Sequence, residues 1–215
     1  MPADETNDLL RETFRKFALD RLLPNYQRWK TESFDPDLLR ELGRLGALGI
    51  AIPEEYGGSG GTRVQLGIAA EEIGRGDFNV TGFLQIGAIT ELLLRHADEP
   101  LRRQWLPPLA SGEAIPSFGL TEPSVGSDAA KLQMTARRDG SDWVLRGEKA
   151  SITFAGLASV CMVFARTGGD GARGISVFAV PLDFPGVARQ VYTSAGGTLV
   201  QRGSLFFDDV RIPAA

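Results

Sequence analysis

Residues 118–128 read Phe-Gly-Leu-Thr-Glu-Pro-Ser-Val-Gly-Ser-Asp and separate two halves of different periodicity. Before them, apolar residues recur at three- and four-residue steps, which is typical of amphipathic helices. After Gly112 the period changes to about two, which is typical of strands. The sequence therefore predicts an α+β fold, with an all-α domain over residues 1–113 and an all-β domain of sandwich or barrel type over residues 114–215.

The composition is ordinary for a globular protein. Hydrophobic residues make up 43% of the 215 residues and charged residues 23%, with a net charge of −4. Because the basic residues are interspersed with acids, we expect no nucleic acid or anionic membrane as a partner. No stretch approaches the ~18 apolar residues of a membrane span, and no basic start precedes an apolar run, so we expect a cytoplasmic protein.

The single cysteine and the single histidine restrict the chemistry. Cys161 alone excludes an internal disulfide and any multi-cysteine metal site, so we predict no metal and a buried, inert Cys161. His96 falls near the end of a predicted helix, where a cation complements the helix dipole. We expect that structural role for His96, and no work as a general base.

The helical half shows recognisable starts and stops. The predicted helices are residues 4–28, bent or ended at Pro24; one that starts at Asp35-Pro36; one capped by Thr62 and Gln65; a mostly apolar one over about 80–96; and one from Asp98 that Pro107-Pro108 interrupts. Residues 50–61 are rich in glycine, yet Ile50, Ile52 and Tyr56 predict a loop that packs on the protein.

The second half predicts several short strands. They cover residues 133–138, 143–149, 159–166, 175–181, 187–192 and 204–212. The first two flank Asp139-Gly140, a strong signal for a β-hairpin.

Five motifs in the same order resemble the acyl-CoA dehydrogenase family of flavoproteins. They are Pro53–Gly60, Leu106–Glu113, the Leu-Thr-Glu-Pro-x-x-Gly-Ser-Asp pattern of Leu120–Asp128, Gly147–Lys149 and Phe207–Pro213. The resemblance implies a helical N-terminal domain, a middle β-domain, and FAD held between that β-domain and a C-terminal helical bundle.

The resemblance also implies cofactor-binding residues in the opening stretch. Phe118, Leu120 and Thr121 are expected to line the isoalloxazine, with Gly126 and Ser127 beside the cofactor and Ser127 also near the pantetheine of an acyl-CoA substrate. The backbone N–H groups of Leu120 and Thr121 and the Thr121 hydroxyl would supply neutral donors to a ring edge that gains charge on reduction. On spacing alone, the stretch also fits a rigid capped turn at a sheet edge.

A second flavin-contacting segment, by the same resemblance, is Ser151, Ile152 and Thr153. The family usually carries Trp-Ile-Thr here, and the indole covers one face of the flavin, which Ser151 cannot do. This departure is a neutral change, or it marks a subgroup, or it argues against the usual electron exit to electron-transfer flavoprotein. Phe154 is a candidate to restore part of the cover.

No residue of this chain is assigned as the catalytic base. Glu122 is expected to be structural, and the family takes its glutamate base from the C-terminal bundle, whereas residues 1–215 match the two preceding domains. The resemblance implies α,β-dehydrogenation of an acyl-CoA thioester to a 2-enoyl-CoA. For this chain alone we expect weak FAD binding and little turnover.

The partners implied are an acyl-CoA substrate, electron-transfer flavoprotein, and either a homo-oligomer (dimer or tetramer) or another chain that supplies the bundle. Two alternatives stay open. One is a non-catalytic FAD- and CoA-binding subunit. The other is an acyl-CoA oxidase or flavin monooxygenase of the same superfamily.

Overall fold

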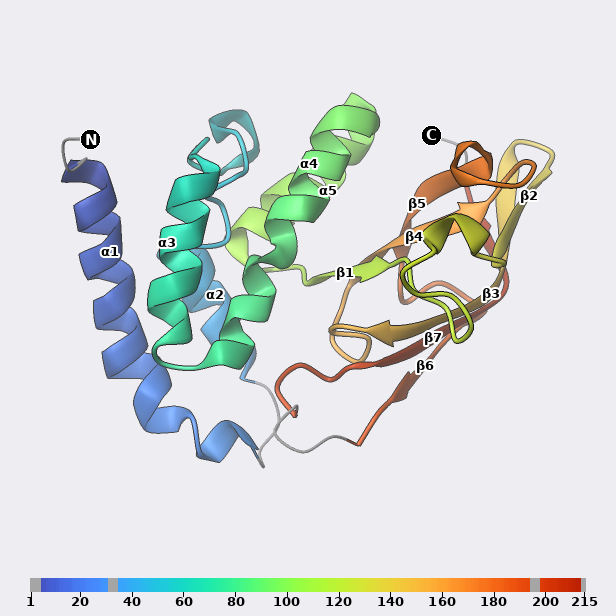
Figure 1. The fold of residues 1–215 in the computed structure, drawn as a ribbon. Coiled ribbons are helices and arrows are strands. Elements are labelled where there is room, and N and C mark those ends of the chain that lie inside the picture. Colours follow the sequence, from blue (N-terminus) through green and yellow to red (C-terminus); the bar gives the residue numbers. More distant parts are fainter. Residues whose placement is uncertain (1–4, 31–34, 194–197, 214–215) are drawn as a thin grey trace. The chain divides into compact units, whose positions relative to one another are not determined.

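Figure 1 shows the computed structural model, which describes residues 5–30, 35–193 and 198–213. The chain divides into two compact units. The first runs up to Ala114 and includes the segment that ends at Val200; the second comprises Ile115–Thr193 and the chain from Gln201 onward. Helices make up the first unit and a mixed β-sheet the second, so the predicted α+β class is confirmed.

The first unit begins with α1 (Glu5–Phe17), which continues as a π-helical turn (Ala18–Leu22) and short 3₁₀ turns at Leu23–Asn25 and Arg28–Lys30. The regular α-helix ends at Phe17, and Pro24 lies in the first 3₁₀ turn, so the helix ends before the proline that was expected to bend or end it. The remaining helices are α2 (Pro36–Arg44), α3 (Arg63–Gly74), α4 (Ile86–His96) and α5 (Glu99–Ser111). Within the described residues, no helix is both long and apolar enough to cross a membrane.

The predicted helix starts at Asp35 and Thr62 are confirmed. The Asp35 carboxylate accepts a hydrogen bond from the Asp37 N–H, and Pro36 occupies the first turn of α2. At α3, Thr62 and Gln65 form a reciprocal capping box. The loop between these helices packs on the unit, as predicted, because Ile50, Ile52 and Tyr56 are all buried.

Two helix predictions are wrong. Residues Phe78–Gln85 form a 3₁₀ helix, so α4 starts only at Ile86. The local sequence explains the difference, because the Thr81 hydroxyl bonds to the Phe78 carbonyl and competes with regular α-helical bonds.

The second wrong prediction concerns Pro107-Pro108, which do not interrupt α5. The helix runs through both prolines to Ser111 and ends at Gly112, whose φ is 79°. Each proline removes one backbone donor, but Leu106 and Leu109 on either side are fully buried, and their packing offsets the loss.

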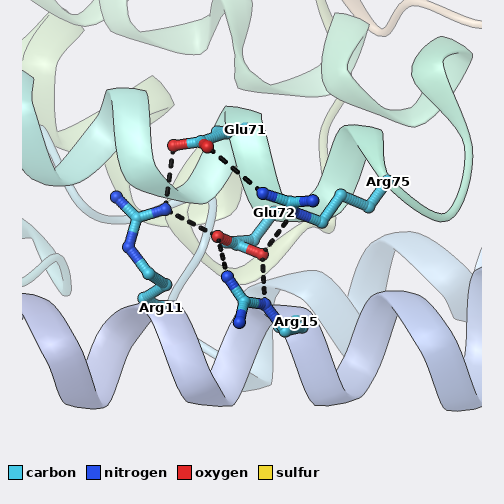
Figure 2. A network of polar contacts seen from close by, with 5 residues as sticks. All are labelled: Arg11, Arg15, Glu71, Glu72 and Arg75. Atoms are coloured by element: carbon cyan, nitrogen blue, oxygen red, sulfur yellow. Dashed lines mark hydrogen bonds and ion pairs between the residues drawn. The ribbon is translucent and has the colours of Figure 1, made fainter.

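A polar network joins α1 to α3 (Figure 2). The fully buried Glu72 carboxylate lies 2.6 Å from the guanidinium of Arg11 and 2.8 Å from those of Arg15 and Arg75. The half-exposed Glu71 also pairs with Arg11 at 2.8 Å. The hydrogen bonds from Arg15, and then those from Arg11, outweigh burial and hold the pKa of Glu72 at about 2. Figure 2 shows this carboxylate enclosed by three guanidinium groups.

The second unit contains one seven-stranded sheet in the order β1-β4-β2-β3-β7-β6, with β5 paired to β4. The strands are β1 (Pro116–Gly119), β2 (Thr135–Asp139), β3 (Asp142–Ile152), β4 (Val160–Arg166), β5 (Ile175–Pro181), β6 (Val187–Val191) and β7 (Gly203–Ile212). The hairpin at Asp139-Gly140 is confirmed, since β2 and β3 pair antiparallel across it. Strands β1 and β2 pair with β4 in parallel, whereas the other pairs are antiparallel.

Strand β1 was not predicted. It has only four residues, and it is a strand because it pairs in parallel with β4, where Pro116 lies opposite Val160. Such a pairing leaves no local signature, because the partner strand lies far along the chain. This short strand carries the start of the stretch 118–128 into the sheet.

Candidate functional site

The structure brings Thr121 of the first predicted cofactor segment next to Ala150, the residue before the second predicted segment, Ser151–Thr153. The backbone N–H of Ala150 in β3 donates to the Thr121 carbonyl at 2.9 Å, just after the end of β1. The contact places Thr121 beside the end of β3. Residues that lie far apart in the sequence therefore share one region of the second unit.

A buried ion pair fixes the crossing of these two segments. The Lys149 Nζ lies 2.8 Å from Oε1 of Glu122 and 3.1 Å from the Leu120 carbonyl oxygen. The side chain of Lys149 is 0% exposed and that of Glu122 is 5% exposed. The Glu122 carboxylate also accepts the backbone N–H groups of Gln133 and Met134, at 2.6 and 2.9 Å. It is thus bound by three donors, which agrees with the predicted structural role of Glu122.

The protonation of this pair follows from its surroundings. Burial lowers the pKa of Lys149, and the hydrogen bond to Glu122 offsets part of that effect. For Glu122, burial alone would raise the pKa, but the bonds from Lys149 and from the two backbone N–H groups outweigh it and leave the pKa below its usual value. Glu122 therefore stays ionised at neutral pH and has no tendency to take up a proton.

The carbonyls of Leu120 and Thr121 are occupied, but their N–H groups remain available. Lys149 and Ala150 bind the two carbonyl oxygens. Among the residues that the structure describes, neither the two N–H groups nor the Thr121 hydroxyl has a hydrogen-bond partner. Both residues are partly exposed. The segment therefore offers three neutral donors on a rigid backbone, which fits an acceptor-rich ring edge.

Phe118 and the turn that follows frame these donors. Phe118 is the one exposed residue of β1, at 36%, and its ring centroid lies 5.0 Å from that of Phe164 in β4. Glu122 and Val125 exchange backbone hydrogen bonds of 2.9 and 3.1 Å, which close a tight turn. The Phe118 ring thus contacts its neighbour and stays partly exposed.

Gly126 and Ser127 follow the turn and are exposed. A Cβ atom added at Gly126 would meet no atom within 4 Å, so the backbone is open to close approach there. Within the described part of the chain, the Ser127 side chain has no hydrogen-bond partner. Contact of either residue with a cofactor or a thioester remains a prediction.

In the second segment, Ser151 and Phe154 adopt left-handed backbone conformations, with φ of 61° and 62°. Such values are uncommon outside glycine and cluster at functional sites. Ser151 and Thr153 are partly exposed, whereas Ile152 and Phe154 are each 2% exposed. The expectation that Phe154 restores cover for a flavin face is therefore wrong, because its ring has almost no accessible surface. Ile152 can face a ligand only through its backbone.

Tyr192 is a neighbour of this segment that no sequence motif predicts. Its hydroxyl accepts the Ser151 N–H at 3.3 Å and lies 2.7 Å from the Ser204 hydroxyl, which donates to Glu148 at 2.9 Å. The three bonds tie the left-handed turn at Ser151 to β7. Only the pairing of β6 with β7 brings Tyr192 to this place, so no local motif announces it.

Cys161 is buried, as predicted, and His96 lies at the predicted end of a helix, whereas its structural role stays a prediction. Cys161 is fully buried, and burial raises the pKa of its thiol to about 12, so it is no nucleophile at neutral pH. His96 is exposed at the last position of α4. In the ranges 5–30, 35–193 and 198–213, no group of three or more His, Cys, Asp or Glu side chains is arranged to hold a metal ion.

Comparison with known proteins adds a family relationship to this geometry. The family model for the acyl-CoA dehydrogenase N-terminal domain matches residues 4–113, and the model for the acyl-CoA dehydrogenase middle domain matches residues 117–210. A probable acyl-CoA dehydrogenase of Bacillus subtilis is 38% identical, over 96% of this chain and 56% of the relative.

Two solved structures share the fold. A glutaryl-CoA dehydrogenase of Mycobacterium smegmatis in complex with FADH2 is 36% identical, has a TM-score of 0.89, and is matched over 98% of this chain and 54% of its own. A glutaryl-coenzyme A dehydrogenase in complex with glutaryl-CoA is 32% identical, with a TM-score of 0.92 and coverage of 99% and 56%. The chain spans about half the length of the curated relatives it matches.

Proposed function

This chain belongs to the acyl-CoA dehydrogenase family, and from that premise we propose that it forms the FAD- and thioester-facing part of an enzyme that converts an acyl-CoA to a 2-enoyl-CoA. The observation that carries the proposal is the set of three free donors at Leu120 and Thr121, held in place by β3. FAD, when bound, supplies the hydride acceptor for this reaction.

In this proposal, the residues of the chain bind and orient. The Leu120 and Thr121 N–H groups and the Thr121 hydroxyl donate to the edge of the ring system, and the partly exposed Phe118 contacts it. Thr153 and the backbone at Ser151 and Ile152 approach from the end of β3. Gly126 and Ser127 lie beside the cofactor, and Ser127 also donates to the pantetheine arm of the substrate.

The general base is the role that these residues leave unfilled. Glu122 is ionised but its carboxylate already accepts three hydrogen bonds, so it is a poor acceptor for a substrate proton. We propose that a residue outside residues 1–215 supplies the base. That residue belongs either to a polypeptide of the same homo-oligomer or to a different partner chain. By itself, this chain then binds FAD weakly and turns over little.

The single cysteine supports a reducing compartment such as the cytoplasm.

The Thr121 hydroxyl provides the direct test. FAD is titrated into the purified chain and binding is followed by flavin fluorescence. Thr121→Val should weaken binding by about tenfold, the value of one hydrogen bond of about 1.4 kcal/mol. Thr135→Val, on β2 in the same unit, is the matched control and should leave binding unchanged. Equal affinities for the two variants and the unmodified chain would argue against the site.

Turnover distinguishes the candidate functions. Stoichiometric FAD on the purified chain, bleached by an acyl-CoA, would overturn the proposed dependence on an external base. Because Ser151 carries no aromatic ring, an oxidase is the second candidate; oxygen consumption without need for an artificial acceptor, in the complete enzyme, would favour it. A protein that binds FAD and acyl-CoA but shows neither reaction is a binding subunit.

A further inference from the structure

The buried Lys149 is more than a structural tie, because of the peptide group that it binds. Its ammonium donates to the Leu120 carbonyl at 3.1 Å. That carbonyl and the Thr121 N–H belong to one peptide group, which is planar and trans, so the two point in opposite directions. Lys149 thus pulls electron density toward the end of this amide that faces it, and the N–H at the other end becomes more acidic.

The surroundings make this polarisation effective. Hydrogen bonds from charged donors are roughly twice as strong as neutral ones, and a chain of bonds strengthens each member. The Lys149 side chain is fully buried, so no water screens its charge from the amide. Glu122 balances the charge of Lys149 at 2.8 Å, which makes its burial tolerable, but the contact to the carbonyl persists.

We propose that Lys149 is a positioning residue that polarises the Leu120–Thr121 peptide group and so turns the Thr121 N–H into a strengthened donor for negative charge that develops on a bound ring. The inference rests on the proposed function for the identity of that ring. Its first half, the polarised amide, concerns the chain alone. A donor of this kind favours the reduced, more negative form of the cofactor over the oxidised form.

The first measurement needs no cofactor. In NMR spectra of the chain, the Thr121 amide proton and the Leu120 carbonyl carbon should both lie downfield of their random-coil positions. Lys149→Met keeps the aliphatic stem and removes the charge, and should move both signals upfield. Lys149→Met with Glu122→Gln removes both charges and leaves no unpaired buried carboxylate, so it should show the same shift where the single variant folds poorly.

Glu72→Gln is the matched control for a general loss of stability. It too removes the charge of a buried carboxylate, but in the first unit, and should leave both signals in place. Unshifted signals in either folded Lys149 variant would overturn the proposal. Random-coil positions in the unmodified chain would overturn it as well, with no variant required.

The second measurement uses bound FAD. Lys149→Met should reduce the preference for reduced over oxidised FAD by about tenfold, which is about 30 mV for a two-electron couple. An unchanged reduction potential of the bound FAD, together with a shifted Thr121 signal, would contradict the proposed effect of Lys149 on the cofactor. The polarisation of the amide would still be supported. Absence of FAD binding in the unmodified chain would instead count against the proposed function, and the NMR result would still decide the role of Lys149.

Discussion

Two buried glutamates are held in different ways. Glu72 is surrounded by guanidinium groups whose own side chains reach solvent, whereas Glu122 is bound by one buried ammonium and two backbone N–H groups. In both, the hydrogen bonds outweigh the cost of burying the charge and lower the pKa. Each carboxylate is therefore a permanently ionised group that stabilises its own unit, and neither is suited to act as a general base.

Glu72→Gln should destabilise the first unit at neutral pH by about 1–3 kcal/mol, because a charged acceptor for three arginines is lost. The pKa of Glu72 is about 2 in the folded chain, below its ordinary 4.5. A lowered folded pKa contributes stability that is complete above the ordinary value and is lost as the pH falls through the folded value. Urea unfolding should show a gap between variant and unmodified chain that is constant above about pH 5 and closes toward about pH 2.

Glu71→Gln is the control for this prediction. Glu71 is 53% exposed, and the value of its pairs is reduced by solvent screening. The Glu71→Gln substitution should change the midpoint of urea unfolding little at any pH. If the stability difference between Glu72→Gln and the unmodified chain widened in acid, the lowered pKa of Glu72 in the folded chain would be contradicted.

At the scale of elements, the β3 strand depends on one glycine. Gly147 has φ of 144°, and an added Cβ would lie 2.8–3.0 Å from atoms of Met134. The pairing of β3 with β7 shifts register at this point, between Leu145 and Gly147. Glycine is therefore needed both for the backbone conformation and for the close approach.

Gly147→Ala should lower the free energy of unfolding by about 1–3 kcal/mol through strain and overpacking. Gly67→Ala is the opposite case: Gly67 lies inside α3, with no atom within 4 Å of an added Cβ. It should stabilise the chain by about 0.5–1 kcal/mol through a lower unfolded-state entropy. Thermal denaturation of the two variants side by side checks both signs, and a neutral Gly147→Ala would contradict the strain argument.

The start of α3 provides a second test at this scale. The Thr62 hydroxyl accepts the Gln65 N–H at 3.3 Å, and the Gln65 side chain accepts the Thr62 N–H at 2.8 Å. Thr62→Ala should cost about 1 kcal/mol, whereas Thr62→Ser should keep most of the cap. Chemical denaturation monitored by helical circular dichroism measures the difference. Equal losses in the two variants would show that the hydroxyl does not cap the helix.

At the scale of the whole molecule, we predict that a substitution in one of the two units raises amide hydrogen exchange in that unit only. Glu72→Gln should raise amide exchange in α1 and α3, and Gly147→Ala should raise it in β3 and β7. Hydrogen exchange read by mass spectrometry resolves these segments. Exchange that rises across both units in either variant would mean that the chain unfolds as one cooperative body.

The sequence by itself determined the fold class, most of the helices and strands, and the two segments of the candidate site. The fold class and the elements follow from local patterns: the change of period after Gly112, the caps at Asp35 and Thr62, and the turn at Asp139-Gly140. The two segments of the candidate site come from the resemblance of their motifs to the family. Such signals lie within a few residues of the element they predict, so they can be recognised in one chain.

Tertiary structure alone decided the rest. Strand β1, the left-handed turn at Ser151, the burial of Phe154 and the approach of Tyr192 all depend on partners far along the chain. The same is true of Lys149, whose ammonium reaches the peptide group of Thr121 only because β3 crosses the end of β1. A sequence motif can thus mark which residues form a site, but the position of a buried charge relative to an amide is a property of the folded chain.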